Sequence, residues 1–94
     1  MKLKILYNKV AIKFIKKNSS KISKDNVDEL IIKAMKKILN KEDINIDLKK
    51  LIDNNNELFR IRKGNIRIIF SYNDSDEIVI SLVENIGYRG DIYK

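Results

Sequence analysis

The spacing of apolar residues changes once along this chain, and that change restricts the folds open to it. Between residues 25 and 40, apolar residues recur at steps of three and four: Val27, Leu30, Ile31, Ala34, Met35 and Ile38. Such a stripe predicts an amphipathic helix with one buried face. From residue 57 onward, apolar and polar residues instead alternate in three segments, 57–63, 66–72 and 77–85. Alternation of this kind is typical of strands with one buried face.

Weaker patterns predict the remaining elements. Residues 2–7 alternate as a short strand, residues 8–18 read as a further helix, and residues 44–52 read as a short extended segment. We expect Asn8 and Asp25 to act as N-caps of the two helices, and a tight turn at Gly64 and Asn65 to join two of the later strands.

These elements predict an α+β fold. We expect an N-terminal strand and two helices packed on one face of a twisted, mainly antiparallel sheet of four to five strands. The chain has 94 residues, no proline, no internal repeat and no segment with the composition of a linker. We therefore expect residues 1–94 to form a single domain.

The composition excludes several kinds of chemistry. The chain has neither cysteine nor histidine, so disulfides, thiolate metal sites and the usual general base are all missing. No phosphate-cradling loop is present, because Gly64, Gly87 and Gly90 all fit turns, and we expect no metal and no small-molecule cofactor. No apolar run is long enough to span a membrane and the first residues do not resemble a signal peptide, so we expect a cytoplasmic protein.

The net charge of +7 is unevenly distributed. Residues 1–24 contain eight lysines and no acidic residue. A basic domain of this size is attracted to polyanions such as nucleic acid or to an acidic protein. The alternative is that lysine, asparagine and isoleucine are simply abundant in this chain.

The four arginines are concentrated in the second half of the chain. Alternation along 57–63 and 66–72 places Arg60, Arg62 and Arg67 on one face of the predicted hairpin, opposite its apolar face. Guanidinium groups gathered in this way repel one another unless an anion neutralises them, and their planar fork suits phosphate. The alternative is a set of ordinary surface ion pairs with nearby carboxylates: Glu57, Asp74 or Glu77.

Two segments together resemble a known family. "LFRIRKGNIRIIF" (58–70) followed by "ENIGYRGDIY" (84–93) resembles the signature of the RelE/ParE superfamily, the toxins of type II toxin–antitoxin operons, most strongly over residues 48–94. The resemblance implies a toxin that an antitoxin protein neutralises. For RelE-like members it implies entry into the ribosomal A site and metal-independent cleavage of mRNA, in which a ribose 2′-OH attacks its own phosphate.

The resemblance also implies roles for individual residues. Arg67, Arg89 and Tyr93 fall on catalytic positions, and the RNA-binding positions fall on Arg60, Arg62 and Lys63. RelE-like nucleases use lysines on the first of these strands, whereas this chain has arginines, which do not lose a proton at ordinary pH. The general base would therefore be Tyr93, with Asp91 assisting, unless Tyr93 is only a packing residue.

Three functions stay open at this point. The first is a ribosome-dependent mRNA endoribonuclease, with the ribosome, mRNA and a cognate antitoxin as partners and the N-terminal lysines gripping ribosomal RNA. The second is a ParE-like inhibitor of DNA gyrase, which needs no terminal tyrosine. The third is a catalytically inactive module that binds an antitoxin.

Overall fold

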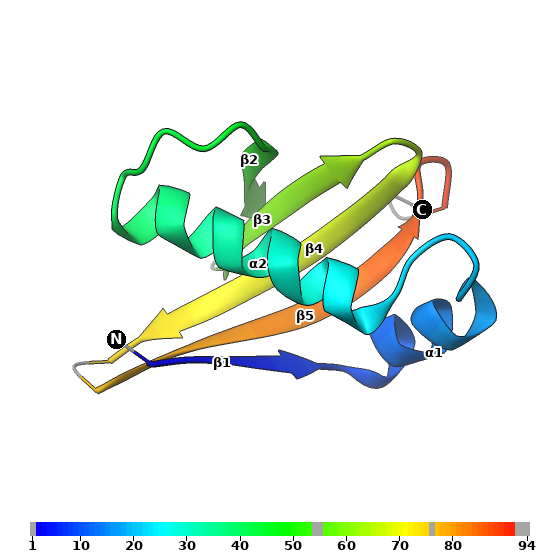
Figure 1. The fold of residues 1–94 in the computed structure, drawn as a ribbon, viewed down its shortest axis with the longest axis horizontal. Helices are drawn as coiled ribbons and strands as arrows, with labels where there is room; N and C mark the ends of the chain where they lie inside the picture. Colours follow the sequence, from blue (N-terminus) through cyan, green and yellow to red (C-terminus); the bar gives the residue numbers. More distant parts are fainter. Residues whose placement is uncertain (1, 54–55, 76, 92–94) are drawn as a thin grey trace.

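Five strands and two helices make up the described part of the chain (Figure 1), which covers residues 2–53, 56–75 and 77–91 in a computed structural model. In chain order the elements are β1 (Lys2–Tyr7), α1 (Lys9–Lys17), α2 (Lys24–Leu39), β2 (Asp47–Asp53), β3 (Asn56–Lys63), β4 (Ile66–Asp74) and β5 (Ile78–Tyr88). The strands form one sheet in the order β1-β5-β4-β3-β2. This confirms the predicted α+β fold. The extended segment predicted at 44–52 corresponds to β2, which is an edge strand of the sheet.

Three of the four strand pairings are antiparallel, and the pairing of β1 with β5 is parallel. A parallel neighbour requires a long crossover, and here α1, α2 and three strands intervene between the two paired strands. The sequence predicted β1 from its alternation but did not indicate its partner. None of the described helices is long and apolar enough to cross a membrane.

Side-chain caps fix where both helices begin. The Asn8 Oδ1 atom accepts a hydrogen bond of 3.1 Å from the Ala11 N–H, which confirms Asn8 as the N-cap of α1. The N-cap of α2 is Ser23, so the prediction of Asp25 was wrong. Ser23 and Asn26 exchange two side-chain to backbone hydrogen bonds of 3.1 Å each. This capping box satisfies two otherwise unpaired N–H groups. As a result, α2 begins two residues before the position that an Asp25 cap would give.

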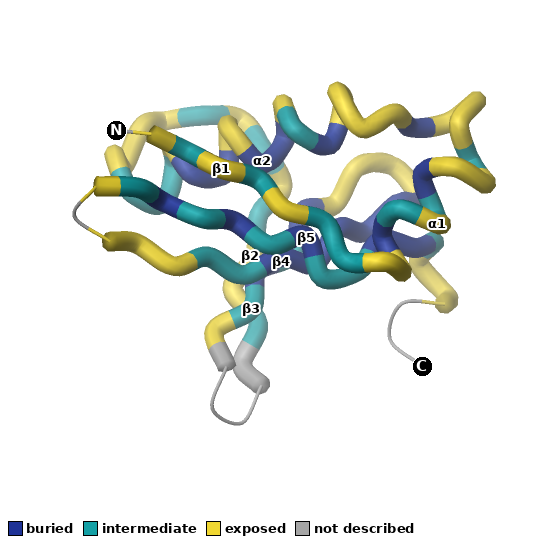
Figure 2. The backbone as a smooth tube through the Cα atoms, turned by 90° about the horizontal axis from the view of Figure 1, so that it is seen from below, coloured by how far each residue is buried: buried dark blue, intermediate teal, exposed yellow. Residues whose placement is uncertain are grey.

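One hydrophobic core lies between the helices and the sheet. Figures 1 and 2 show α2 crossing one face of the sheet, with α1 beside the end of β5. The predicted apolar stripe of α2 is buried at Val27, Leu30, Ile31, Ala34 and Met35. It shares its core with strand residues that include Ile61, Ile68, Phe70, Val79 and Val83. Neither of the two described helices covers the opposite face of the sheet, and we call it the open face.

A phenol joins β1 to the first turns of α2. The Tyr7 hydroxyl donates a hydrogen bond to the Asp28 carboxylate and lies 3.3 Å from the Lys24 carbonyl oxygen. The Lys24 ammonium lies 5.4 Å from the Tyr7 ring centroid and 3.8 Å from an Asp28 oxygen. Partial burial, and then the hydrogen bond to Asp28 and its negative charge, raise the pKa of Tyr7.

Replacing Tyr7 by phenylalanine is expected to lower the free energy of unfolding by about 1–2 kcal/mol at pH 7, because a hydrogen bond to a charged group is lost. Above pH ~10 a tyrosine in the unfolded chain ionises while folded Tyr7 stays neutral, so this contribution falls as pH rises. Urea unfolding at several pH values between 7 and 11 measures the gap between the two proteins. Tyr72→Phe controls for the loss of one phenol, and a Tyr7 gap that stays constant through pH 11 would contradict the expectation.

Candidate nucleic-acid interface

The predicted grouping of three arginines on one face is confirmed by the strand register. Arg62 pairs across the strands with Arg67, and Arg60 pairs with Ile69, so all of these side chains belong to the open face. The expectation that the strand over 66–72 buries only one face was wrong. Arg67 and Ile69 are only 5% and 8% exposed, whereas the Arg62 side chain is 54% exposed.

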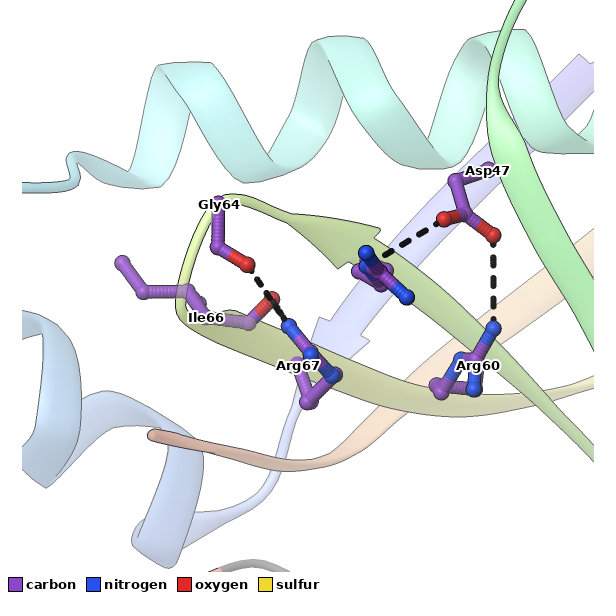
Figure 3. A network of polar contacts seen from close by, with 6 residues as sticks. Asp47, Arg60, Gly64, Ile66 and Arg67 are labelled. Carbon is purple, nitrogen blue, oxygen red and sulfur yellow. Dashed lines mark hydrogen bonds and ion pairs between the residues drawn. The ribbon is translucent and has the colours of Figure 1, made fainter. Parts of the chain in front are cut away.

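A carboxylate from the edge strand lies between two of the guanidiniums. Asp47 Oδ1 lies 3.3 Å from Arg60 Nη2, and Asp47 Oδ2 lies 3.4 Å from Arg62 Nε (Figure 3). Asp47 is the first residue of β2 and stands opposite Arg62 in the register of β2 with β3. The sequence pattern gave no register for β2, which is why Asp47 was missed.

The carboxylates expected to pair with these arginines were the wrong ones. In the described structure the arginine partner is Asp47, and not Glu57, Asp74 or Glu77. Glu57 instead pairs with Lys50 at 3.3 Å. Alternation along β3 places residue 57 on the helix-covered face, so its carboxylate cannot reach the arginines of the open face.

Arg67 holds the tip of the β3–β4 hairpin. Its Nη1 atom donates hydrogen bonds to the carbonyl oxygens of Gly64, at 2.8 Å, and Ile66, at 3.3 Å (Figure 3). Gly64 has a φ of 57°, which glycine adopts without strain at the first position of a two-residue turn. Across the sheet Arg67 faces Gly87, which lies inside β5 rather than in the expected turn and presents no competing side chain.

Arg89 is brought to the same hairpin tip by the backbone. Its N–H donates a hydrogen bond of 2.8 Å to the Asn65 carbonyl oxygen, and the residue is exposed directly after β5. Lys63 is also exposed, but it pairs across the hairpin with Ile66 and therefore belongs to the opposite face from Arg62. The structure thus places Arg60, Arg62 and Arg67 on one face of the hairpin and the Arg89 backbone at its tip, with Lys63 on the opposite face.

The proposed general base cannot be placed. Tyr93 lies outside the described residues, and its catalytic or packing role stays a prediction. Asp91, expected to assist it, is exposed, and its N–H donates a hydrogen bond of 2.9 Å to the Tyr88 carbonyl oxygen. Over residues 2–53, 56–75 and 77–91, no three acidic side chains gather closely enough to hold a metal ion.

The end of β5 is also held against the lysine-rich N-terminal region. The Tyr88 hydroxyl donates a hydrogen bond of 2.7 Å to Asn18, the C-cap of α1, and the Tyr88 ring packs edge-on against Phe14 at 5.2 Å. All eight lysines in residues 2–24 are exposed, and four of them belong to α1: Lys9, Lys13, Lys16 and Lys17. A basic helix therefore adjoins the arginine end of the sheet.

The chemistry of this region is that of an anion-binding surface. Arg60, Arg62 and Arg67 share the open face with Asp47, and among the described ion pairs this one carboxylate serves two of the three guanidiniums, so positive charge is left over. The Nε atom of Arg60 is buried and has no hydrogen-bond partner among the described groups. An unmade hydrogen bond at a buried charged donor costs about 1–3 kcal/mol or more. A bound oxyanion could provide the hydrogen-bond acceptor for Arg60 Nε that Asp47 does not provide.

Comparison with solved structures identifies a known toxin fold. No protein-family model matches the chain, and neither does any curated protein sequence. The archaeal RelE–RelB complex from Pyrococcus horikoshii OT3 contains a chain that superposes with a TM-score of 0.56 at 22% identity, covering 97% of this chain and 99% of that one.

Two further structures agree with this match. A chain of the RelB–RelE antitoxin–toxin complex from Methanococcus jannaschii gives a TM-score of 0.51 at 19% identity, covering 94% of each chain. YafQ from E. coli strain BL21(DE3) gives 0.57 at 13% identity, covering 99% of this chain and 100% of that one. The chain therefore has a RelE-like fold, in which two helices lie on one face of a five-stranded sheet. The resemblance seen in the sequence is confirmed at that level.

Proposed function

We propose that this protein is the toxin of a type II toxin–antitoxin system and that it cuts mRNA on the ribosome. The observation that carries the proposal is that Arg60, Arg62 and Arg67 share the open face of a hairpin whose tip is bonded to the Arg89 backbone. The RelE-like fold over nearly the whole chain supports it. Action on ribosomes would place the protein in the cytoplasm.

The reaction that suits these groups is attack by a ribose 2′-OH on the adjacent phosphate. It requires removal of the 2′-OH proton, stabilisation of a pentavalent phosphate and protonation of the leaving 5′-oxygen. The exposed guanidinium of Arg89 is suited to the phosphate, and Arg60 and Arg62 are suited to the RNA backbone. Proton transfer is assigned to Tyr93, because arginine keeps its proton.

Arg67 has a different part in this proposal. Its Nη1 atom is already bonded to the Gly64 and Ile66 carbonyl oxygens, and the residue is buried. It would fix the hairpin tip between Arg62 and Arg89 and add positive potential beneath the phosphate. Direct contact with RNA, as the resemblance implies, would require the guanidinium to leave those carbonyls.

An antitoxin is the proposed protein partner. Two of the solved structures with this fold are complexes of RelE with RelB. On this chain, a groove of about 330 Å³ lies between α2 and the β1 side of the sheet, with mostly apolar lining: Leu3, Ile5, Ile32, Met35, Lys36, Leu39, Asn40 and Val79. An amphipathic helix of an antitoxin would suit such a lining.

Expression of the wild-type protein, Arg89→Ala and Tyr93→Phe tests the proposal. The wild type is expected to stop translation promptly and to leave mRNA cut at codon spacing, while each variant weakens both effects by about 100-fold or more. DNA supercoiling is followed in the same cells. A supercoiling defect with intact mRNA would indicate that the protein is a gyrase inhibitor. Unaffected growth would indicate a catalytically inactive module that binds an antitoxin.

A further inference from the structure

The contact between Asp47 and the two guanidiniums is incomplete on the arginine side. Asp47 reaches Arg60 through Nη2, at 3.3 Å, while the neighbouring Nε of Arg60 is buried and has no partner among the residues that the structure describes. Guanidinium binds an oxyanion most strongly side-on, with Nε and one Nη donating together. The guanidinium of Arg60 is therefore held in place but not satisfied.

The contact is also weak on the carboxylate side. The distances of 3.3 and 3.4 Å from Asp47 to Arg60 and Arg62 exceed the roughly 2.7–2.9 Å of a strong charge-assisted hydrogen bond. The Asp47 side chain is 49% exposed and begins an edge strand. Ion pairs this exposed contribute little to stability, so the carboxylate can turn toward solvent at small cost.

A phosphate fits the same pair better than a carboxylate does. Arg60 and Arg62 are two residues apart on one strand and both approach the Asp47 carboxylate, so their guanidiniums flank a common space. A phosphodiester has one negative charge on two non-bridging oxygens, as a carboxylate has, but unlike Asp47 it is not tethered to β2 and can approach Nε and Nη of Arg60 together with Arg62. Its binding would supply the partner that the Arg60 Nε lacks.

We infer that Asp47 is an internal competitor in the free protein, because it occupies the space between Arg60 and Arg62 where the proposed function places a phosphodiester of single-stranded RNA. RNA binds by displacing the Asp47 carboxylate from both guanidiniums. The choice of RNA as the source of the phosphate rests on the proposed function. The competition itself rests only on the geometry of these three side chains.

The test is the affinity of Asp47→Asn for a short single-stranded RNA in which every 2′-OH is methylated, so that it cannot be cut. Fluorescence anisotropy at about 0.1 M salt is expected to show binding three- to tenfold tighter than that of the wild type, because two exposed ion pairs no longer compete. Equal thermal unfolding midpoints establish that both proteins are folded.

Glu57→Gln is the matched control, because it removes the same charge from the neighbouring strand but frees Lys50 on the other face. It is expected to change RNA affinity less than twofold. In an Arg62→Gln background, the gain from Asp47→Asn is expected to shrink, since one of the two arginines is gone. Unchanged or weaker binding by Asp47→Asn, or an equal gain from Glu57→Gln, would overturn the inference.

A polyglutamate peptide distinguishes the class of ligand. If Asp47→Asn gains affinity for the peptide and none for the RNA, the site belongs to an acidic protein segment and the inference is wrong. The binding assay contains no ribosome and needs no cleavage. If Asp47→Asn gains RNA affinity but the wild-type protein does not stop translation, the proposed function is contradicted and the competition at the phosphate site is still supported.

Discussion

Replacing Arg60 and Arg62 together by alanine is expected to weaken the arrest of translation by about 100-fold or more. A hydrogen bond to a charged group contributes about 1.5–3 kcal/mol, and two such contacts with an RNA backbone account for a loss of that size. Arg60→Ala also removes packing, because the Arg60 side chain is only 17% exposed. Dose–response curves in a cell-free translation system measure the loss.

Lys33→Ala with Lys41→Ala is the matched control for this pair. It removes the same two charges from exposed positions on α2 and shortly after it, away from the open face of the sheet. The control is expected to act within a few-fold of the wild type. Equal losses in the two double variants would mean that total positive charge, and not the arginine pair, determines activity, which would contradict the assignment of this face.

Phe70→Ala is expected to lower the free energy of unfolding by about 3–5 kcal/mol, because it opens a cavity at the centre of the core. Phe70 is fully buried, and its ring stacks on Phe59 with centroids 5.6 Å apart. Small domains have about 5–15 kcal/mol of stability in total. A substantial share of the variant should therefore be unfolded at elevated temperature, as urea and thermal unfolding will show.

Val10→Ala provides the comparison for Phe70, because Val10 is apolar but 56% exposed on α1. Its loss is expected to cost less than about 0.5–1 kcal/mol. If Phe70→Ala cost no more than Val10→Ala, the core would not be centred on the helix-covered face of β4. The assignment of the opposite face as the open, functional one would then fail as well.

The sequence predicted those parts of the fold that one segment determines by itself. The helical stripe of α2 and the alternation along β3 and β5 each bury one face without reference to any other segment, whereas β4 is buried on both faces from Ile66 to Phe70. The N-cap of α2 was predicted two residues late, because the exchange between Ser23 and Asn26 competes with the preference for an acidic cap. Ser23 and Asp25 are both favourable N-cap residues, and the sequence pattern does not distinguish between them.

The parts that could not be predicted depend on strand pairing. Asp47 reaches Arg60 and Arg62 only because β2 pairs with β3 in one particular register, and the alternation of β2 is too weak to set it. The burial of Arg67 has a similar origin, since it depends on how the hairpin tip folds back onto the side chain. The face of each arginine was therefore predictable from the sequence, but its partner was not.

The most direct test of the proposed reaction is cleavage of a defined mRNA on purified ribosomes with a vacant A site. We expect the wild-type protein to cut within the A-site codon and to leave a 2′,3′-cyclic phosphate, since the 2′-OH of the message is the attacking group. A single 2′-deoxy substitution at the cut position is expected to abolish the product. An mRNA that stays intact when the ribosomes are saturated with the protein, or one that is still cut after the 2′-deoxy substitution, would contradict the account.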